Sequence, residues 1–168
     1  MKVLFDTNVV LDVLLAREPH AVVAARLFAL VERGEIEGCL CATTITAVHY
    51  LAPRAVGPKD AQRHVRQLLS LFKVAPVTGE IVTSALSLGF PDFEDGVVHE
   101  AARAYGAAAI VTRNARDFAR DSLPILSPVE LLAAVPRRMR DDARVAMIHS
   151  ERAVSRADRV ARQLRTRN

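Results

Sequence analysis

Three short segments of the chain carry acidic and polar side chains next to predicted strands and helices. The segments are residues 6–8, 92–95 and 112–117, and their candidate residues are Asp6, Asp92, Glu94, Asp95, Thr112, Asn114 and Asp117. Carboxylates this numerous raise one another's pKa when they share a pocket, unless a cation neutralises them. Mg²⁺ accepts such oxygen ligands and keeps positions for water and phosphate oxygens. If the segments converge, they predict a metal-dependent hydrolytic site.

Each segment also has a purely structural interpretation. Asp92 is a good N-cap for the helix that follows it, and Glu94 and Asp95 lie in the first turn, where the helix dipole favours acids. We favour capping for Asp92 and the site for Asp95, because a cap explains only one or two of these acids. Asp6 ends a strand and has no obvious structural role. His99 is one turn beyond Asp95 and is a lesser candidate for substrate contact.

Alternating strand and helix patterns would bring the segments together. Buried strands are predicted at 2–5, 36–42, 74–77, 108–111 and 125–126. Helices are predicted at 9–15, 19–33, 43–51, 59–72, 78–88, 93–105 and 128–135, with Thr43-Thr44, Thr78 and the Ser127–Glu130 capping box at three of their starts. The pattern predicts an α/β fold, a three-layer α/β/α sandwich around a parallel sheet of about five strands. Ligands of such sheets bind outside the carboxyl ends of the strands.

Charge divides the chain into two predicted parts. Residues 137–168 hold ten arginines against four acids, a net charge of +6, which leaves −2 of the total +4 for residues 1–136. We expect a compact domain at 1–136 and an Arg-rich, helix-favouring extension at 137–168. Arg113 and Arg116 add basic side chains to the third segment and are candidates for phosphate contacts.

Composition excludes several classes of protein. The chain has no uncharged apolar run of 18 residues and no secretory signal at its start, so we expect a cytoplasmic protein without a membrane span. Cys39 and Cys41 are the only cysteines, too few for a zinc site, and we expect them to be reduced thiols on one face of a strand.

In their order along the chain, these segments resemble the PIN domain family. The stretches that carry the resemblance are Val3-Leu4-Phe5-Asp6-Thr7-Asn8, Asp92-Phe93-Glu94-Asp95, residues 110–118 and residues 124–132. The match runs from about residue 2 to 133 and is closest to the bacterial branch that includes VapC-type toxins. The resemblance implies an α/β/α sandwich and an Mg²⁺- or Mn²⁺-dependent endoribonuclease, the toxin of a toxin–antitoxin pair. It also implies RNA, a small antitoxin protein and a second copy of the chain as partners.

The resemblance assigns roles to individual residues. Asp6, Glu94, Asp95 and Asp117 are expected to hold the metal, Thr112 and Asn114 to position water or phosphate, and Arg113 and Arg116 to contact RNA. The chain departs from the family pattern at two of its positions. Asn114 stands where many members have an acid, so Asp117 is its expected substitute. Ala47 stands where many have a glutamate, a loss that Glu94 or Asp92 could compensate.

Two other functions fit parts of the sequence. A catalytically weak or inactive module of the same fold, binding RNA or an antitoxin, is favoured by Ala47 and Asn114. An aspartyl-phosphate protein also uses an Asp at a strand end, but a phosphohydrolase needs a second Asp where this chain has Asn8. A receiver domain needs a late lysine, and no lysine follows Lys73.

Overall fold

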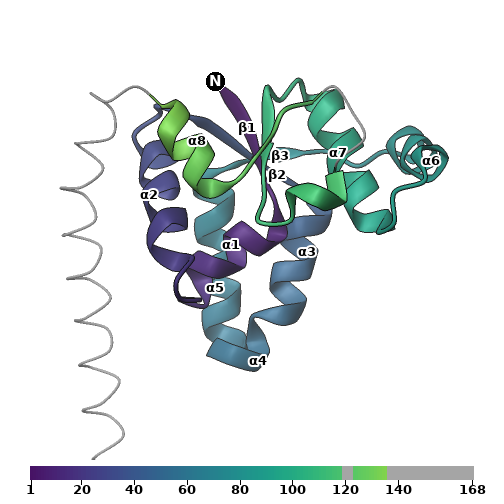
Figure 1. Ribbon diagram of the computed structural model, residues 1–168. Coiled ribbons are helices and arrows are strands. Elements are labelled where there is room, and N and C mark those ends of the chain that lie inside the picture. The colour runs from purple at the N-terminus through teal and green to yellow at the C-terminus, as the bar shows by residue number, and fades with distance from the viewer. Residues whose placement is uncertain (119–122, 136–168) are drawn as a thin grey trace, which may run out of the picture.

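A five-stranded parallel sheet forms the centre of the molecule (Figure 1). The computed structural model describes residues 1–118 and 123–135, so the extension predicted at 137–168 lies outside the described residues. The strands are β1 (Lys2–Phe5), β2 (Glu37–Cys41), β3 (Lys73–Ala75), β4 (Ala109–Val111) and β5 (Ile125–Leu126). Their order in the sheet is β3-β2-β1-β4-β5.

The sheet reverses its strand order beside β1. Leu4 of β1 is in register with Cys39 of β2 on one side and with Ile110 of β4 on the other. The chain moves from β1 through β2 to β3 at one edge, and then returns to β4 on the far side of β1. A crevice therefore opens between the carboxyl ends of β1 and β4, where ligands of open α/β sheets bind.

Helices cover both faces of the sheet. They are α1 (Thr7–Leu14), α2 (Ala21–Glu32), α3 (Ala42–Leu51), α4 (Pro53–Val56), α5 (Pro58–Leu71), α6 (Gly79–Leu88), α7 (Phe93–Tyr105) and α8 (Pro128–Ala134), with a 3₁₀ turn, η1 (Ala115–Phe118). Residues of α1, α2, α5 and α8 share one core with Phe5, whereas α6 and α7 share the other core with Leu4. The predicted three-layer α/β/α sandwich is confirmed.

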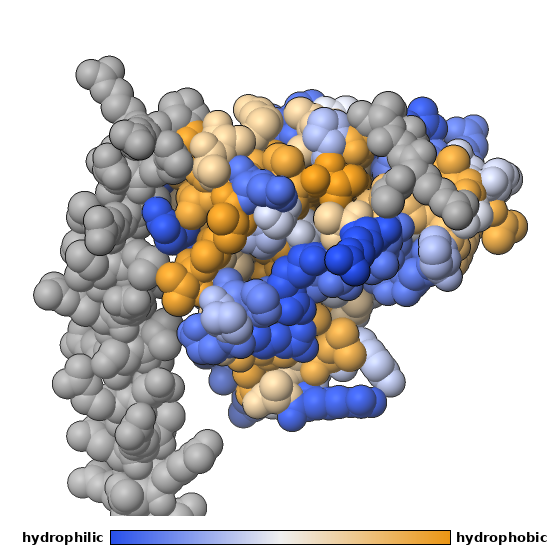
Figure 2. Space-filling view, viewed as in Figure 1, coloured by the Kyte–Doolittle hydropathy of each residue, from blue (hydrophilic) through white to orange (hydrophobic). Residues whose placement is uncertain are grey.

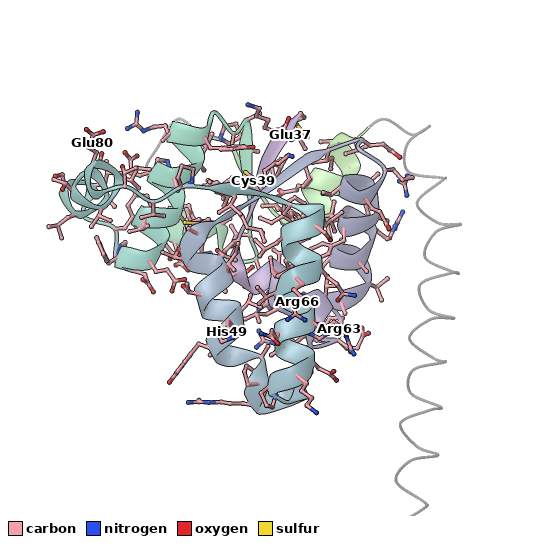
Figure 3. The ribbon with its side chains drawn as sticks, turned by 180° about the vertical axis from the view of Figure 1, so that it is seen from behind. Glu37, Cys39, His49, Arg63, Arg66 and Glu80 are labelled. Atoms are coloured by element: carbon pink, nitrogen blue, oxygen red, sulfur yellow. The ribbon has the colours of Figure 1, made fainter. Side chains whose placement is uncertain are left out.

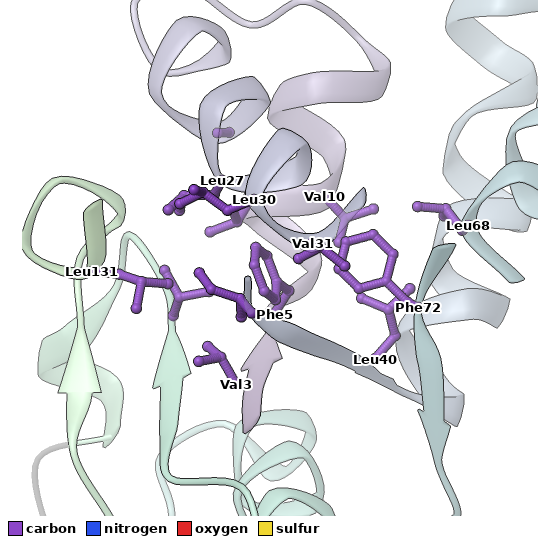
Figure 4. Close-up of a cluster of buried hydrophobic side chains, with 14 of the residues drawn as sticks. Val3, Phe5, Val10, Leu27, Leu30, Val31, Leu40, Leu68, Phe72 and Leu131 are labelled. Atoms are coloured by element: carbon purple, nitrogen blue, oxygen red, sulfur yellow. The ribbon is translucent and has the colours of Figure 1, made fainter. Parts of the chain in front are cut away.

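The larger core contains the rings of Phe5 and Phe72 (Figure 4), and the partly buried Phe28 packs against them. Phe5 lies 5.9 Å from Phe28 and 5.1 Å from Phe72 between ring centroids, in edge-to-face geometry. The Phe72 ring also presses on Gly38 of β2, where an added Cβ would be 2.7 Å from the ring and 2.9 Å from Val31. Only glycine fits at this position, so the close packing of α5 and α2 on the sheet depends on Gly38.

Helix starts follow the predicted capping residues in three places. Asp92 accepts a 2.8 Å hydrogen bond from the Glu94 backbone N–H, Thr78 caps α6, and Ser127 and Glu130 form the predicted capping box. The predicted Thr43-Thr44 cap is wrong. Strand β2 runs directly into α3, which begins at Ala42 with Cys41 at its N-cap position and no side-chain cap. The buried Thr44 hydroxyl instead lies 3.0 Å from that of Thr7 in α1.

Cys39 and Cys41 are free thiols buried in the smaller core, on the same face of β2, as predicted. Burial raises the pKa of Cys39 to about 12, so this thiol remains protonated. Figure 3 shows Cys39 in the sheet and the basic residues Arg63 and Arg66 on α5, seen from behind. No helix of the described part of the chain has the length and apolar character needed to cross a membrane.

Candidate active site: an acidic cleft at the carboxyl ends of β1 and β4

Asp6 stands at the end of the central strand with only 6% of its surface exposed. Its backbone N–H bonds to the Val111 carbonyl of β4, so the sheet itself fixes its position. The side chain occupies the N-cap position of α1 but does not cap it. Burial raises the pKa of Asp6, and a hydrogen bond from Thr112 is the largest of the effects that oppose the rise. Capping therefore does not explain this carboxylate.

A small hydrogen-bond network holds the Asp6 carboxylate. The Thr112 hydroxyl donates to Asp6 Oδ2 at 2.6 Å, and Asn8 Nδ2 donates to the same oxygen at 2.5 Å. The same hydroxyl accepts from Asn8 Nδ2 at 3.0 Å and from the Asn114 backbone N–H at 3.0 Å. Because Thr112 is fully buried and its hydroxyl is fully engaged, it positions Asp6 rather than contacting a bound phosphate.

A cleft of about 440 Å³ opens in front of Asp6. Figure 2 shows hydrophilic residues in a band across the middle of this face, over the region where α1 lies in Figure 1. The lining residues of the cleft are Asp6, Thr7, Asn8, Leu11, Arg17, Ala47, Leu51, Pro91, Asp92, Glu94, Asp95, Asn114 and Asp117. All three predicted segments, which together span residues 6–117 of the chain, contribute to this wall.

The acids of the cleft interact with one another. The pKa of Asp95 is raised to about 7, first by burial and then by the negative charges of Asp6, Asp92, Asp117 and Glu94. The pKa of Glu94 is raised too, by burial and then by Asp92 and Asp6. Each carboxylate therefore destabilises the ionised form of its neighbours, the condition that a bound cation relieves.

The oxygen-rich lining fits a hard divalent cation of the Mg²⁺ or Mn²⁺ class, with Asp6, Glu94, Asp95 and Asp117 as the carboxylates that would hold it. Within residues 1–118 and 123–135, however, no three Asp, Glu, His or Cys side chains are gathered closely enough to form a ready-made metal site. What the cleft offers to a cation is therefore the set of oxygen donors in its lining.

Arg113 does not line the cleft, contrary to the expectation that it contacts phosphate. Its Nε lies 3.0 Å from Asp12 Oδ2 of α1, in an ion pair not aligned as a hydrogen bond, and its backbone N–H donates to Asn8 Oδ1 at 3.2 Å. Asp12 is fully buried, and burial raises its pKa against the charge of Arg113. The arginine therefore neutralises a buried acid and ties the end of β4 to α1. Arg116 is exposed on η1 and also lies outside the cleft lining.

His99 lies one turn beyond Asp95 on α7, but it is buried and does not line the cleft. Its Nδ1 lies 3.2 Å from Glu100 Oε1, and its ring packs beside Phe90 at 5.4 Å between centroids. Glu100 is also hydrogen-bonded by Arg103 and Ser84, and these bonds, that of Arg103 foremost, lower the pKa of Glu100 to about 2. His99 therefore belongs to a network that joins α7 to α6, and it is no longer a candidate for substrate contact.

The sequence did not predict Arg17 as a cleft residue, and it identified position 47 only through the family resemblance. Among the described residues, Arg17 is the single basic side chain in the lining. It follows Ala16, whose φ of 48° is left-handed, and no sequence pattern predicts that turn. Ala47 lies in the wall, at the place where the family resemblance predicts a missing glutamate, so the lost carboxylate belongs to this cleft.

Comparisons with known proteins agree with this architecture. The sequence profile of the PIN domain family matches residues 2–116. No curated protein sequence matches the chain. A toxin–antitoxin complex from Klebsiella pneumoniae is similar at 22% identity and a TM-score of 0.59, covering 75% of this chain and 97% of that chain.

Two further solved structures are similar. VapBC2 from Rickettsia felis, bound to a DNA fragment from its promoter, has 12% identity and a TM-score of 0.60, covering 76% of this chain and 98% of that chain. The sarcin–ricin loop cleaving toxin VapC20 from Mycobacterium tuberculosis has 16% identity and a TM-score of 0.55, and the match covers 64% of this chain and 86% of that chain. At these identities the likeness establishes the fold alone.

The raised pKa of Asp95 predicts a pH-dependent stability. In the folded protein this group holds its proton up to about pH 7, and in the unfolded chain only to about its ordinary value of 3.8. The group's contribution to stability is therefore complete below pH 3.8 and is lost as the pH rises through 7. In metal-free buffer, Asp95→Asn should raise the melting temperature at pH 8 by more than at pH 5, measured by differential scanning calorimetry. Equal shifts at the two pH values, matching Asp60→Asn on α5, would contradict the electrostatic coupling.

Replacing the two arginines that follow β4 should change the free energy of unfolding by very different amounts. Arg113→Ala leaves the buried Asp12 carboxylate unpaired, and we expect the free energy of unfolding to fall by about 1–3 kcal/mol. The loss should be smaller than for a fully buried ion pair, because the Arg113 side chain is 30% exposed. Arg116→Ala on exposed η1 should change stability by no more than about 0.5 kcal/mol. Urea denaturation of both variants checks this. Equal stability of the two would mean that the ion pair with Asp12 contributes nothing.

Proposed function

Because the chain belongs to the PIN domain family, we propose that it is a metal-dependent endoribonuclease that hydrolyses RNA phosphodiester bonds. The observation that carries the proposal is the convergence of Asp6, Glu94, Asp95 and Asp117 on one cleft at the carboxyl ends of β1 and β4. We further propose that the protein is the toxin of a toxin–antitoxin pair, with a small antitoxin and a second copy of the chain as partners. This part is supported by the toxin–antitoxin complexes among the similar structures.

The chain's own residues supply binding and orientation. Thr112 and Asn8 hold the Asp6 carboxylate through Oδ2, which leaves Oδ1 without a side-chain hydrogen bond in the described part of the chain. Asp95 lines the cleft together with Asp6, Glu94 and Asp117, and would hold the metal ion with them. Asn114 presents an exposed amide that can donate to a phosphate oxygen. Mg²⁺ or Mn²⁺, when bound, would polarise the phosphodiester and activate water.

Arg17 supplies the positive charge that an acidic cleft needs before it can accept an anionic substrate. Its backbone N–H bonds to the Asp12 carbonyl at 2.9 Å, and its own carbonyl accepts from the N–H of His20 at 3.0 Å, so the turn after α1 is fixed. The adjacent left-handed Ala16 is a strained conformation that the surrounding bonds maintain. Among the described residues the Arg17 side chain makes no ion pair or hydrogen bond. We assign it to a phosphate of the RNA, the role first expected of Arg113.

The central test is cleavage of total tRNA and rRNA with Mg²⁺ or Mn²⁺. The purified protein should cleave, and Asp6→Asn and Asp95→Asn should each abolish cleavage, because each removes a carboxylate from the cleft. Asp60→Asn on α5, outside the cleft lining, is the matched control and should cleave normally. Unchanged cleavage by both cleft variants would refute the assignment of the site.

A catalytically inactive module is the competing function, favoured by Ala47 and Asn114, which stand where many members of the family have acids. Titration of the purified protein with Mn²⁺ by isothermal calorimetry separates the two. The nuclease binds Mn²⁺ and loses that binding in Asp6→Asn, whereas an inactive module shows neither binding nor turnover.

The role of Arg17 predicts a particular dependence on salt. Arg17→Ala should raise KM for RNA and lower the slope of log KM against log salt concentration by about 0.7, the value for one lost phosphate contact on a single strand. Arg63→Ala on the opposite face (Figure 3) should leave both quantities unchanged. If Arg17→Ala and Arg63→Ala give the same slope as the wild type, Arg17 does not contact phosphate.

A further inference from the structure

A second hollow lies beside the acidic cleft, between α3 and α7. Its volume is about 450 Å³, and its lining residues are Thr43, Thr46, Ala47, Tyr50, Phe93, Glu94 and Val97. Ala47 and Glu94 also line the cleft, so the two hollows adjoin each other. Figure 2 shows apolar surface bordering the hydrophilic band where α3 lies in Figure 1. We call this second hollow the aromatic groove.

The groove gathers the exposed aromatic side chains of the protein. Tyr50 is 67% exposed and Phe93 is 48% exposed. The remaining six aromatic residues of the chain, which are Phe5, Phe28, Phe72, Phe90, Tyr105 and Phe118, are buried or half-buried. An exposed phenylalanine contributes little to folding, and two exposed rings lining one groove are the mark of a binding surface.

Helical periodicity explains why these rings line the same groove. Thr43, Ala47 and Tyr50 recur on α3 at the spacing of one helix face, and Phe93 and Val97 do the same on α7. The groove is therefore formed by two helix faces that the fold leaves uncovered in the described structure, with hydroxyl groups of Thr43 and Thr46 along one wall.

Arg54 of α4 lies beside Tyr50, outside the lining of the groove itself. Its guanidinium carbon lies 5.3 Å from the centre of the Tyr50 ring, and its Nη2 donates to the Tyr50 hydroxyl at 3.3 Å. These contacts orient the ring and place a cation at the mouth of an apolar surface. Aromatic rings combined with arginine are the surface that single-stranded nucleic acids use for stacking and backbone contact.

We propose that the aromatic groove binds an unpaired nucleobase of the RNA substrate, next to the phosphate that is cleaved, by stacking on Tyr50 and Phe93. This inference rests on the proposed nuclease function. A phosphate held in the cleft tethers the neighbouring nucleotide to within reach of the groove, which makes that base the occupant of highest effective concentration. The Thr43 hydroxyl donates its proton to Cys41 Sγ and the Thr46 hydroxyl donates to the Thr43 carbonyl, so both oxygens keep lone pairs that can accept from the base edge.

The proposal gives the substrate a structural class. A base can enter the groove only when it is unpaired and turned out of a helix, as in loops, bulges and single strands. The protein should therefore cleave RNA at unpaired positions and spare the same sequence within a duplex. The specificity would come from the shape and stacking of one nucleotide rather than from contacts along a long sequence.

The test uses the full-length protein and a short oligoribonucleotide in which the cleaved linkage has been mapped. Values of kcat/KM are measured for this RNA and for two versions with an abasic nucleotide on either side of the linkage. One abasic version should be cleaved roughly 5- to 100-fold less efficiently by the wild type, as expected for the loss of one stacked base. Tyr50→Ala and Phe93→Ala should lose a similar factor on the intact RNA and should not distinguish it from that abasic version.

Matched variants separate stacking from other effects. Tyr50→Phe and Phe93→Tyr keep the rings and should retain the discrimination, and Leu86→Ala, 72% exposed on α6, should behave as the wild type. Sedimentation of each variant reports whether the groove instead joins two copies. Alanine variants that become monomeric while still discriminating against the abasic RNA would overturn the proposal in favour of a protein interface.

Two further outcomes are distinguishable. If the wild-type protein cleaves RNA but treats intact and abasic substrates alike, the groove inference fails and the nuclease function stands. If the wild type cleaves no RNA with either metal ion, the nuclease function fails and the inference fails with it.

Discussion

The structure depends on keeping one charged group, the carboxylate of Asp6, at the buried end of the central strand. A buried carboxylate is costly unless hydrogen bonds satisfy it. Here the donors come from two sides, Asn8 in the first turn of α1 and Thr112 at the end of β4. The pairing of β1 with β4, and the direct entry of β1 into α1, are therefore both required to stabilise this one group.

The charges around Asp6 are arranged in layers. Behind the cleft, the fully buried Asp12 is paired with Arg113, so this acid is neutralised within the protein. In the cleft, Asp95 and Glu94 have raised pKa values, and burial and their acidic neighbours maintain the rise. Along the wall, Arg17 is the single cation among the described lining residues. The protein thus neutralises the acids that it uses for structure and leaves those of the cleft to be neutralised by what binds there.

Much of the fold follows from local sequence because the signals are independent and agree. Apolar runs without alternation predict strands buried on both faces, and the strand–helix alternation then forces a parallel sheet. The convergence of Asp6, Asp95 and Asp117 on one cleft was predictable because parallel strands end at one edge. The places of the Arg113 and His99 side chains were not predictable, because the sequence does not show whether a side chain at such a position points into the cleft or into the core. The start of α3 was missed because β2 enters it without a loop, so that Thr43 and Thr44 fall inside the helix.

The first turn of α7 shows how a single short segment can serve several purposes. An α-helix turns by about 100° per residue, so neighbouring side chains point in very different directions. Asp92 caps the helix, Phe93 lines the aromatic groove, and Asp95 lines the acidic cleft, while Glu94 lies on the wall that the two hollows share. From the other side, Ala47 of α3 is also shared by both hollows. A glutamate at this position would add charge to the cleft and bulk at its junction with the groove. The small side chain of Ala47 lowers the number of carboxylates in the cleft and leaves the boundary between the two hollows without a bulky group, so the departure from the family pattern at position 47 affects both hollows at once.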